Sequence, residues 1–552
     1  MRQSRRLFWF PLLAILACAL VGGLYGQRVK AADDPSRSDQ TVSQGLDSFA
    51  RVFALVQGNY ADKVDSDKAV FGPENVNTLG AIPGMLRTLD PHSNFLDART
   101  FARFTENQEG KYYGVGMRIL TVPAAMGKWT TTVTEPMAGS PAFHAGVRPG
   151  DVIMAVDGKP AEDMDGELVA KTLKGPRGTV VHVTISREGY DKPLDFAITR
   201  QEITGMSVDD YFLAQPGIAY AHIASFSETT GSELAAALKK LGGRNLKGVV
   251  LDLRGNPGGI LQAAVDVADQ FLEKGQLIVY HNGRNSPEER YRARSTGEGA
   301  DYPIVVLIDH QTASAAEIVT GALQDHDRAL VMGQTSFGKG LVQKVYPLSE
   351  GTGLLLTTAH YYTPSGRLIQ RNYENVSLYD YLYAPRHDAP AHPDLHRTDG
   401  GRQVYGGGGI TPDIQVDDQA VSPVETKLLA TDACPDFLQC GPFFDFGRHY
   451  LGVHKTVARD FMPDDSTLAE FREFAAKDGV TLSDKDFKDH ADFIKNHLRD
   501  LLVGMIYGED EARHMSLVSD SMVQKAIGAL PQAAALATHA KKYMAAHAVP
   551  ES

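Results

Sequence analysis

The sequence is poor in cysteine and has no surplus of basic residues. Its 552 residues include 3 Cys, too few for disulfides to hold a chain of this length together. There are 55 Lys and Arg against 68 Asp and Glu, and the net charge of −13 argues against a nucleic-acid binder. The 53 Gly follow no G-X-Y period, which excludes a collagen-like chain. The composition, 43% hydrophobic and 22% charged, is typical of a globular protein, and the length predicts about three to four domains.

Sequence patterns for cofactors are also absent. No group of His, Cys, Asp and Glu residues has the spacing of metal ligands, so we expect neither a metal nor another cofactor. A glycine-rich turn at 255–259 is not followed by the Lys-Ser or Lys-Thr that a Walker nucleotide site requires.

The first residues have the layout of an export signal. Arg2, Arg5 and Arg6 precede the uncharged stretch 7–27, which approaches the ~20 apolar residues that span a bilayer. We therefore expect residues 1–31 to be a signal peptide or an N-terminal membrane anchor, with the rest of the chain in the periplasm or at the outer face of the inner membrane. In an oxidising compartment Cys434 and Cys440 could close a small disulfide loop, and two free thiols are the alternative.

Periodicity divides the remaining chain into four further segments. A polar linker at 32–44 and helices at 47–60 and 76–89 are expected in the segment 32–105. Strands and tight turns are expected in 106–198, and strand–helix alternation in 199–421. The segment 422–552 is predicted to be helical, with helices at 465–477, 484–507 and 520–547. The fold class is therefore a multidomain α/β protein with helical regions at both ends.

The second segment resembles a PDZ domain. Gly114-Val115-Gly116-Met117 opens a strand, and the turns Pro149-Gly150-Asp151 and Val156-Asp157-Gly158 follow. The backbone N–H groups of such a glycine loop can hold the C-terminal carboxylate of a peptide, and the strand from Met117 can pair with it. The alternative is that these glycines serve only tight turns.

In the third segment, residues that could take part in catalysis follow the ends of two strands. The strand 246–254 runs into the glycine turn 255–259 and then a helix, which concentrates backbone N–H groups and positive dipole at one point. The strand 304–308 leads to Ser314 at a strand-to-helix turn, and no Gly-x-Ser-x-Gly elbow surrounds this serine. Lys339 is flanked by glycines and followed by apolar residues, which is unusual for a solvated lysine.

Together these motifs resemble the C-terminal processing peptidases, or tail-specific proteases, of serine peptidase family S41. The resemblance runs from about residue 45 to about residue 420. It rests on the following segments in this order: Leu89-Asp90-Pro91-His92-Ser93, the PDZ block, 252–259, Ala313-Ser314-Ala315, 321–325, Phe337-Gly338-Lys339-Gly340 to Gln343, and 362–367. The resemblance implies a crotonase-like strand–helix protease core into which the PDZ domain is inserted.

The resemblance also implies a serine–lysine mechanism. Ser314 would be the nucleophile, Lys339 the general base and Gln343 the residue that orients the lysine. Burial favours a neutral, basic amine, because it disfavours the charged form. The backbone N–H groups of Ala315 and Gly258 (or a neighbour of Gly258) would form the oxyanion hole, and Asp325 would support the site.

Each of these residues has a structural interpretation when taken alone. Ser314 could cap a helix, and Lys339 could extend along the surface to water. The combination in the order of the family favours catalysis. In the PDZ domain, Lys174 is a candidate peptide-binding residue together with Gly114, Val115, Gly116 and Met117. It stands where the family commonly has Arg, and its grip on a carboxylate would be weaker than the two-hydrogen-bond grip of Arg.

The sequence therefore predicts an exported serine endopeptidase that binds the C-terminal tails of proteins. A homo-oligomer is expected, and an adaptor or lipoprotein is a candidate partner. The main alternative is a catalytically silent PDZ scaffold at the membrane, for which substitution of Ser314 would leave function unchanged.

Overall fold

A computed structural model describes most of the chain. The described residues are 35–59, 64–72, 80–124, 127–137, 139–294, 301–374, 376–383, 394–416, 422–429, 441–477 and 479–547. The expected signal or anchor segment (1–31) and both Cys434 and Cys440 lie outside them. None of the helices in these described ranges is long and apolar enough to span a bilayer. The chain divides into two units, residues 1–85 and residues 86–552.

The first unit contains helices, and one of them begins earlier than the sequence predicted. Helix α2 (Pro35–Asn59) includes most of the expected linker 32–44, so that prediction was wrong. Proline is favoured in the first helical turn because its missing N–H would have no intrahelical partner there. Helix α3 (Ser66–Phe71) follows, and α4 (Ala81–Arg87) has Pro83 in its first turn, where it does not kink the helix.

The region that resembles a PDZ domain is built on one antiparallel sheet of order β3-β4-β5-β7-β8, with β6 beside β5. Its interior contains fully buried side chains such as Val133, Val156 and Ile185. Before and after it, β2 (Lys111–Gly114) and β9 (Gln201–Thr204) pair with each other, so the chain enters and leaves the region at one point. Its elements are β3 (Met117–Pro123), β4 (Trp129–Pro136), α6 (Pro141–Ala145), β5 (Val152–Val156), β6 (Lys159–Pro160), η2 (Ala161–Asp163), α7 (Gly166–Leu173), β7 (Val180–Ser186) and β8 (Leu194–Thr199).

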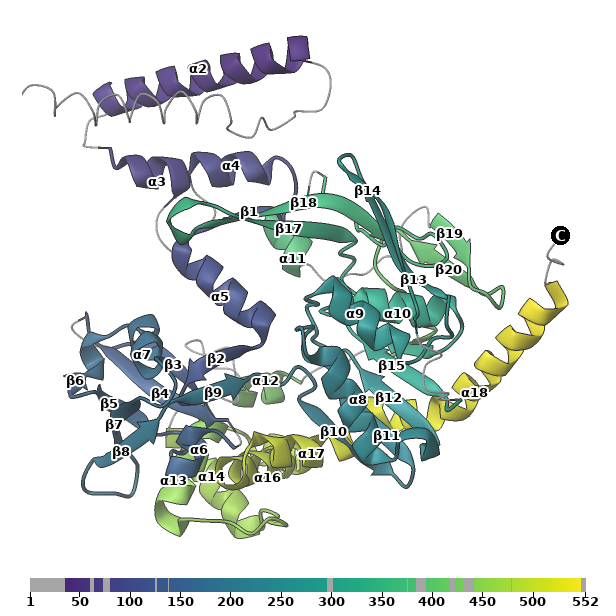
Figure 1. The fold of residues 1–552 in the computed structure, drawn as a ribbon. Coiled ribbons are helices and arrows are strands. Elements are labelled where there is room, and N and C mark those ends of the chain that lie inside the picture. Colours follow the sequence, from purple (N-terminus) through teal and green to yellow (C-terminus); the bar gives the residue numbers. More distant parts are fainter. Residues whose placement is uncertain are drawn as a thin grey trace, which may run out of the picture. The chain divides into compact units, whose positions relative to one another are not determined.

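A six-stranded sheet of order β10-β11-β12-β15-β16-β21 forms the centre of the second unit (Figure 1). Neighbouring strands are parallel from β11 onward. In β12, Val249 and Leu251 face one apolar cluster while Val250 faces another. Burial on both faces explains the uninterrupted apolar runs in the sequence. The strands are β10 (Asp210–Gln215), β11 (Ile218–His222), β12 (Gly248–Asp252), β15 (Ile304–Ile308), β16 (Leu330–Gly333) and β21 (Ile414–Gln415).

Helices cover both faces of this sheet. On one face lie α8 (Thr230–Leu241), α9 (Leu261–Asp269) and α10 (Ala315–Asp325). On the other face, Val523 and Leu530 of α18 (Ser521–His547) pack against Val250 and Leu307 of the strands. The last helix of the predicted C-terminal region is therefore a layer of the central domain.

A second sheet has the order β1-β18-β13-β14, and β17 pairs with β18. Strand β1 (Asn94–Leu96) comes from the segment expected to be helical and pairs with residues 353–355 of β18. Three residues are too short a run to show a periodicity, which is why the sequence did not reveal this strand. The other strands of this sheet are β13 (Leu277–Gly283), β14 (Ser286–Arg292), β17 (Leu341–Pro347) and β18 (Gly353–Tyr362). Strands β19 (Asp394–Arg397) and β20 (Gln403–Gly406) form a separate two-stranded sheet. The remaining elements are η5 (Ser349–Gly351), α11 (Leu378–Tyr383), α5 (Ala98–Glu109) after β1, and η3 (Gly243–Asn245) before β12.

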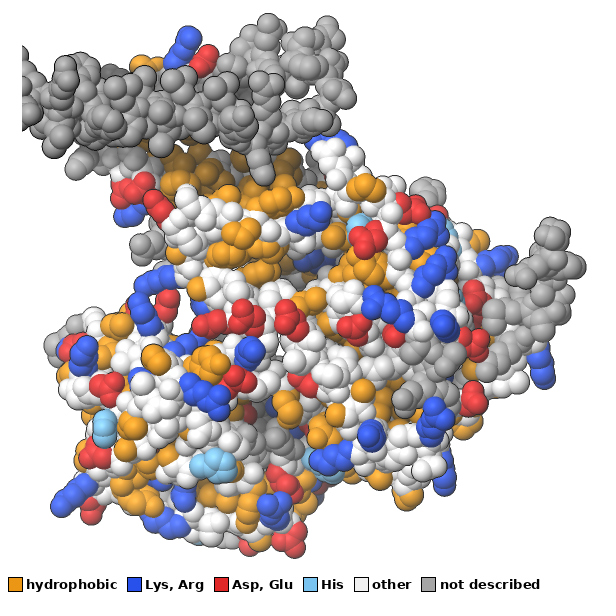
Figure 2. Space-filling model, in the orientation of Figure 1, with side chains coloured by type: hydrophobic (Ala, Val, Ile, Leu, Met, Phe, Trp, Pro, Cys, Tyr) orange, Lys and Arg blue, Asp and Glu red, His pale blue; other side chains and the backbone are white. Residues whose placement is uncertain are grey.

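The C-terminal segment is helical, as predicted. Its helices are α12 (Pro423–Leu429), α13 (Pro442–His454), α14 (Asp465–Lys477), α15 (Asp484–Asp489), α16 (Ala491–Tyr507), α17 (Glu509–Ser519) and α18. The helix predicted over 484–507 is divided at His490. Helix α13 contacts the PDZ-like region, where His449 lies 3.1 Å from Glu188 and Lys455 Nζ donates to the carbonyl of Gly189. Basic and acidic side chains are interspersed on the face shown in Figure 2.

Candidate active site

Ser314 occupies the turn between β15 and α10. Its backbone has φ 54° and ψ −114°, a conformation that residues other than glycine rarely adopt. The preceding loop is held by Asp309, whose carboxylate accepts hydrogen bonds from the N–H groups of Gln311 and Thr312. The strained turn therefore presents the serine at the N-terminus of a buried helix, where the helix dipole favours developing negative charge.

Glu317 joins the serine loop to the lysine loop. Its carboxylate is fully buried and accepts from the N–H groups of Ser314 (2.8 Å), Gly338 (2.6 Å) and Lys339 (2.9 Å), and from the Ser336 hydroxyl (2.5 Å). Burial raises the pKa of Glu317, and these hydrogen bonds oppose that effect only in part. One carboxylate thus fixes the backbone of both candidate catalytic residues.

Tyr361 makes a second connection between the two loops. Its hydroxyl lies 3.0 Å from the carbonyl oxygen of Ser314 and 2.5 Å from that of Lys339. The ring is 1% exposed, and burial raises the pKa of the hydroxyl far above its usual value, so it stays a donor.

The Lys339 amine is held by Gln343. Lys339 Nζ donates to Gln343 Oε1 (2.8 Å), and Gln343 Nε2 donates to the carbonyl oxygen of His92 (2.8 Å). Burial lowers the pKa of Lys339, while the charges of Asp90 and Glu317 oppose this effect. Among the hydrogen bonds of the described residues, none joins the amine to the Ser314 hydroxyl. The amine is thus desolvated and oriented but not yet in contact with the serine.

His92 adjoins the site through its carbonyl oxygen, and its lowered pKa makes its ring neutral. Burial and the positive charge of Lys339 lower its pKa to about 3. Its Nε2 lies 2.9 Å from the hydroxyl of Tyr381, and its ring packs edge-on against Phe337. The contribution of His92 to the site is therefore its carbonyl oxygen, which holds Gln343.

The glycine turn after β12 lies directly against Ser314. A Cβ atom at Gly258 would come within 2.8 Å of Ser314 Cβ and 2.9 Å of the nitrogen of Ala315, so only glycine fits there. The Gly258 N–H donates to Asn256 Oδ1 (2.8 Å), whereas the N–H groups of Gly259 and Ala315 have no acceptor among the described residues. The turn thus brings the backbone donors expected for an oxyanion hole to the serine, with that of Gly258 engaged by its own loop.

Asp325 lies at the opposite end of α10 from Ser314. It is 1% exposed and accepts from Arg367 Nη2 (2.5 Å) and from the N–H of Ser365 (2.9 Å). Arg367 is itself fully buried. This ion pair fixes the loop after β18 to the helix that begins at the serine.

The glycine loop of the PDZ-like region connects β2 to β3. Gly116 has φ +72°, and its carbonyl oxygen accepts from the Ser140 hydroxyl, while the carbonyl of Val115 accepts from the N–H of Ala142. Gly114 ends β2 and Met117 begins β3. Lys174 is paired with Glu106 of α5. In this structure the lysine is therefore engaged by an acidic partner.

No group of His, Cys, Asp and Glu residues suited to hold a metal ion occurs in the described ranges. The site contains a hydroxyl, a desolvated amine and backbone N–H donors. Acyl transfer uses these groups as nucleophile, general base and oxyanion donors.

Comparison with known proteins identifies the family. The sequence model of peptidase family S41 matches residues 217–375, and that of the PDZ domain matches residues 132–187. A carboxy-terminal-processing protease of Bartonella bacilliformis is 37% identical over 370 residues, which cover 66% of this chain and 80% of that protein. The chain belongs to the carboxy-terminal-processing proteases of family S41. It is therefore a serine-type protease with a PDZ domain, as predicted.

Other members of the family are similarly related. The carboxy-terminal processing protease CtpB of Bacillus subtilis is 32% identical, over 61% of this chain and 68% of its own. Among solved structures, a photosystem II D1 C-terminal processing protease is 27% identical, over 71% of this chain and 98% of its own, with a TM-score of 0.33.

Sequence reasoning missed Glu317 and Tyr361. A signal for Glu317 was present, because Ser314 and Glu317 have the Ser-x-x-Glu spacing of a helix capping box. No local pattern marks Tyr361, which lies in β18 and is aligned with the lysine loop by the hydrogen bond from its N–H to the carbonyl oxygen of Gly340.

Proposed function

We propose that this protease cleaves peptide bonds with Ser314 as nucleophile and Lys339 as general base. The Ser314 hydroxyl attacks the scissile carbonyl carbon as its proton passes to the neutral Lys339 amine. The resulting ammonium protonates the leaving amine, and water then hydrolyses the acyl-enzyme by the same proton route. Gln343 orients the amine for these transfers.

The observation that carries this proposal is the joint anchoring of the two loops. The Glu317 carboxylate holds the N–H groups of Ser314 and Lys339, and Tyr361 lies at both of their carbonyl oxygens. We expect a movement of the Lys339 side chain to bring the amine to the hydroxyl, while burial lowers the pKa of the amine.

The oxyanion would be stabilised by the N–H of Ala315 and by one donor from the 258–259 turn. The Gly258 N–H serves only after it leaves Asn256 Oδ1, whereas that of Gly259 has no acceptor to leave among the described residues. Each such donor typically contributes about 2.7 to 4 kcal/mol to transition-state stabilisation.

The PDZ domain would deliver the substrate by binding its C-terminal tail at residues 114–117, where a glycine loop precedes β3. The relatives are named for carboxy-terminal processing. We also propose export, supported by the basic and apolar pattern of residues 2–27. A crotonase-like core is supported by the parallel strands β11, β12, β15 and β16 with helices α8, α9 and α10 between them.

The decisive experiment measures cleavage of an unfolded protein by the purified chain and its variants. Ser314→Ala and Lys339→Ala should each lower kcat by about 10⁴-fold or more, whereas Lys344→Ala, an exposed lysine in the same strand as Gln343, should be unaffected. Cleavage that survives the first two substitutions would reject the assigned site. A scaffold without catalysis predicts no cleavage by the unmodified chain.

Tail recognition is tested with two versions of one substrate peptide, one with a free and one with an amidated C-terminus. Amidation removes the charge that the PDZ loop would bind, so it should raise KM. Equal KM values for the two peptides would contradict tail recognition.

A further inference from the structure

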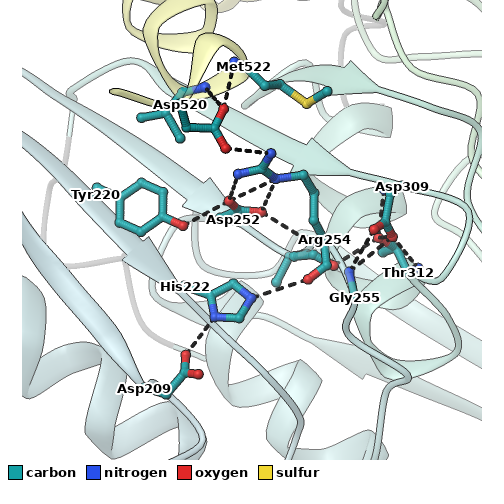
Figure 3. A network of polar contacts seen from close by, with 12 residues as sticks. Asp209, Tyr220, His222, Asp252, Arg254, Gly255, Asp309, Thr312, Asp520 and Met522 are labelled. Atoms are coloured by element: carbon teal, nitrogen blue, oxygen red, sulfur yellow. Dashed lines mark hydrogen bonds and ion pairs between the residues drawn. The ribbon is translucent and has the colours of Figure 1, made fainter. Parts of the chain in front are cut away.

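A buried carboxylate stands at the start of the glycine turn that faces Ser314. Asp252, at the end of β12, is 1% exposed and accepts from Tyr220 (2.8 Å) and from Arg254 Nη2 (2.6 Å), as Figure 3 shows. Arg254 follows two residues later and leads into the turn 255–259. Arg254 is therefore one of the groups that hold the start of the turn, beside the Gly255 N–H, which donates to the carboxylate of Asp309 (Figure 3).

The C-terminal helices hold the Arg254 side chain from the other side. Arg254 Nη1 lies 3.1 Å from Asp520 Oδ2, in the junction between α17 and α18 (Figure 3). The other oxygen of Asp520 accepts from the N–H groups of Met522 and Val523 and so caps α18. One carboxylate thus links the capped start of α18, whose apolar face packs on the central sheet, to the arginine of the turn.

A second connection reaches the backbone of the same arginine. His222 Nε2 lies 3.2 Å from the carbonyl oxygen of Arg254, and His222 Nδ1 lies 2.6 Å from Asp209 Oδ1. Both ring nitrogens face acceptors, so the ring fits as an imidazolium that donates twice. Asp209 Oδ2 in turn accepts from Arg513 of α17 (2.6 Å).

Both connections begin in α17 and α18 and end at Arg254. The residues that supply them, Arg513 and Asp520, lie outside the residues 217–375 that match the S41 family model. Helix α18 can hold Asp520 in a fixed position, because the apolar side chains of the helix pack on the central sheet. A displacement of about 1 Å in a catalytic group can lower a rate by about 100-fold.

We propose that Asp520 and Arg513 are positioning residues that hold the turn 255–259 in register with Ser314, so that the C-terminal helices set the efficiency of the oxyanion hole. This inference rests on the proposed function, in which that turn supplies an oxyanion donor. The helices contribute no group to the reaction. They fix the arginine from which the turn departs.

Asp520→Asn is the sharpest variant for a test, because asparagine is also a good helix N-cap while the ion pair with Arg254 is lost. The matched control is Glu511→Gln on α17, which removes an ion pair to Arg459 that stays within the helical segment. Arg513→Gln tests the second connection. Asp520→Glu restores the charge and should recover part of any loss.

The purified full-length variants are assayed for kcat and KM with one peptide substrate, for inhibition by a peptide aldehyde of the same sequence, and for melting temperature. The aldehyde forms a tetrahedral adduct with the serine that needs the oxyanion hole. We expect Asp520→Asn to lower kcat about tenfold with KM within twofold, to weaken aldehyde inhibition by a similar factor, and to leave the pH midpoint of kcat/KM unchanged. Arg513→Gln should act in the same direction.

The proposal is overturned if Asp520→Asn matches Glu511→Gln in kcat and aldehyde inhibition, or if its loss of activity equals its loss of folded protein. It is also overturned if only KM changes. Failure of the proposed function is distinguishable, because then either Ser314→Ala keeps the activity of the unmodified chain or the unmodified chain has none, whatever the effect of Asp520→Asn.

Discussion

Two buried carboxylates flank the catalytic serine, and their partners are of different kinds. Glu317, on the side of the nucleophile and base, is 0% exposed and is satisfied by three backbone N–H groups and one hydroxyl. Asp252, on the side of the oxyanion turn, is 1% exposed and is paired with the guanidinium of Arg254. The first carboxylate needs no cation, whereas the second depends on one.

This difference separates local from distant control. The partners of Glu317 come from residues within a short stretch of chain, and they move with the loops that carry Ser314 and Lys339. The partner of Asp252 is held by Asp520, which is 266 positions away from Arg254. The contacts of Glu317 on the nucleophile side are therefore made within residues 314–339, whereas the contact of Arg254 on the oxyanion side reaches the C-terminal helices.

Among the variants that test this comparison, Glu317→Gln should have the largest effect. The amide NH₂ of glutamine would face the backbone N–H groups of Ser314 and Lys339, which now donate to the carboxylate. Two donors cannot pair with each other, so Ser314 and Lys339 would separate. We expect kcat to fall by about 1000-fold, because a misplacement of about 1 Å already accounts for roughly 100-fold. Steady-state kinetics measure this loss, and the exposed Glu228→Gln serves as the control. An active Glu317→Gln variant would contradict the anchoring role of this carboxylate.

Arg254→Met should lower stability, and it should also lower kcat because the turn 255–259 loses the arginine that Asp520 holds. The substitution leaves Asp252 buried without its cation, and such changes typically lower the free energy of unfolding by about 3 to 5 kcal/mol. Denaturant unfolding measures the loss. The double variant Asp252→Asn/Arg254→Met should recover part of it, because no unpaired charge remains. If the double variant is no more stable than Arg254→Met, Asp252 does not depend on its cation.

His222→Gln should give a smaller, pH-dependent loss of stability. Burial alone would lower the pKa of His222, but the hydrogen bond and charge of Asp209 outweigh it and raise the pKa to about 9. Because the folded state favours the protonated ring, the contribution of His222 is complete below about pH 6.5 and disappears as the pH rises through about 9. The difference from the unmodified chain should be at most about 3 kcal/mol at pH 6 and close to zero at pH 10. The control is His182→Gln at an exposed histidine, which should show no such dependence on pH. If the stability loss of His222→Gln does not depend on pH either, the ring of His222 is neutral and the prediction is wrong.

The sequence predicted most of what is local. The helix predicted at 465–477 coincides with α14, and Ser314 lies at the strand-to-helix turn where the pattern put it. Amphipathic spacing and strand length carry such information within a few residues. The early start of α2 was missed because its first turns are polar and show no apolar period.

The connections that cross the fold could not be predicted. The sequence predicts that a helix begins at Asp520, and in the structure Asp520 caps α18. Nothing in the sequence near Asp520 indicates that it contacts Arg254. The Asn256 contact with Gly258 was equally invisible, because it depends on the backbone conformation of the turn. Such contacts follow from tertiary packing, which a single sequence does not reveal.

The central claim is that a neutral Lys339 amine takes the proton of Ser314. The most direct test is the rate at which an uncharged phosphonylating reagent modifies Ser314 as a function of pH. The rate should rise with pH to a midpoint below the ordinary lysine value of about 10.4, because burial lowers the pKa of Lys339, and the rise should be absent in Lys339→Met. A rate that does not depend on pH, or a profile that is unchanged in Lys339→Met, would contradict the account.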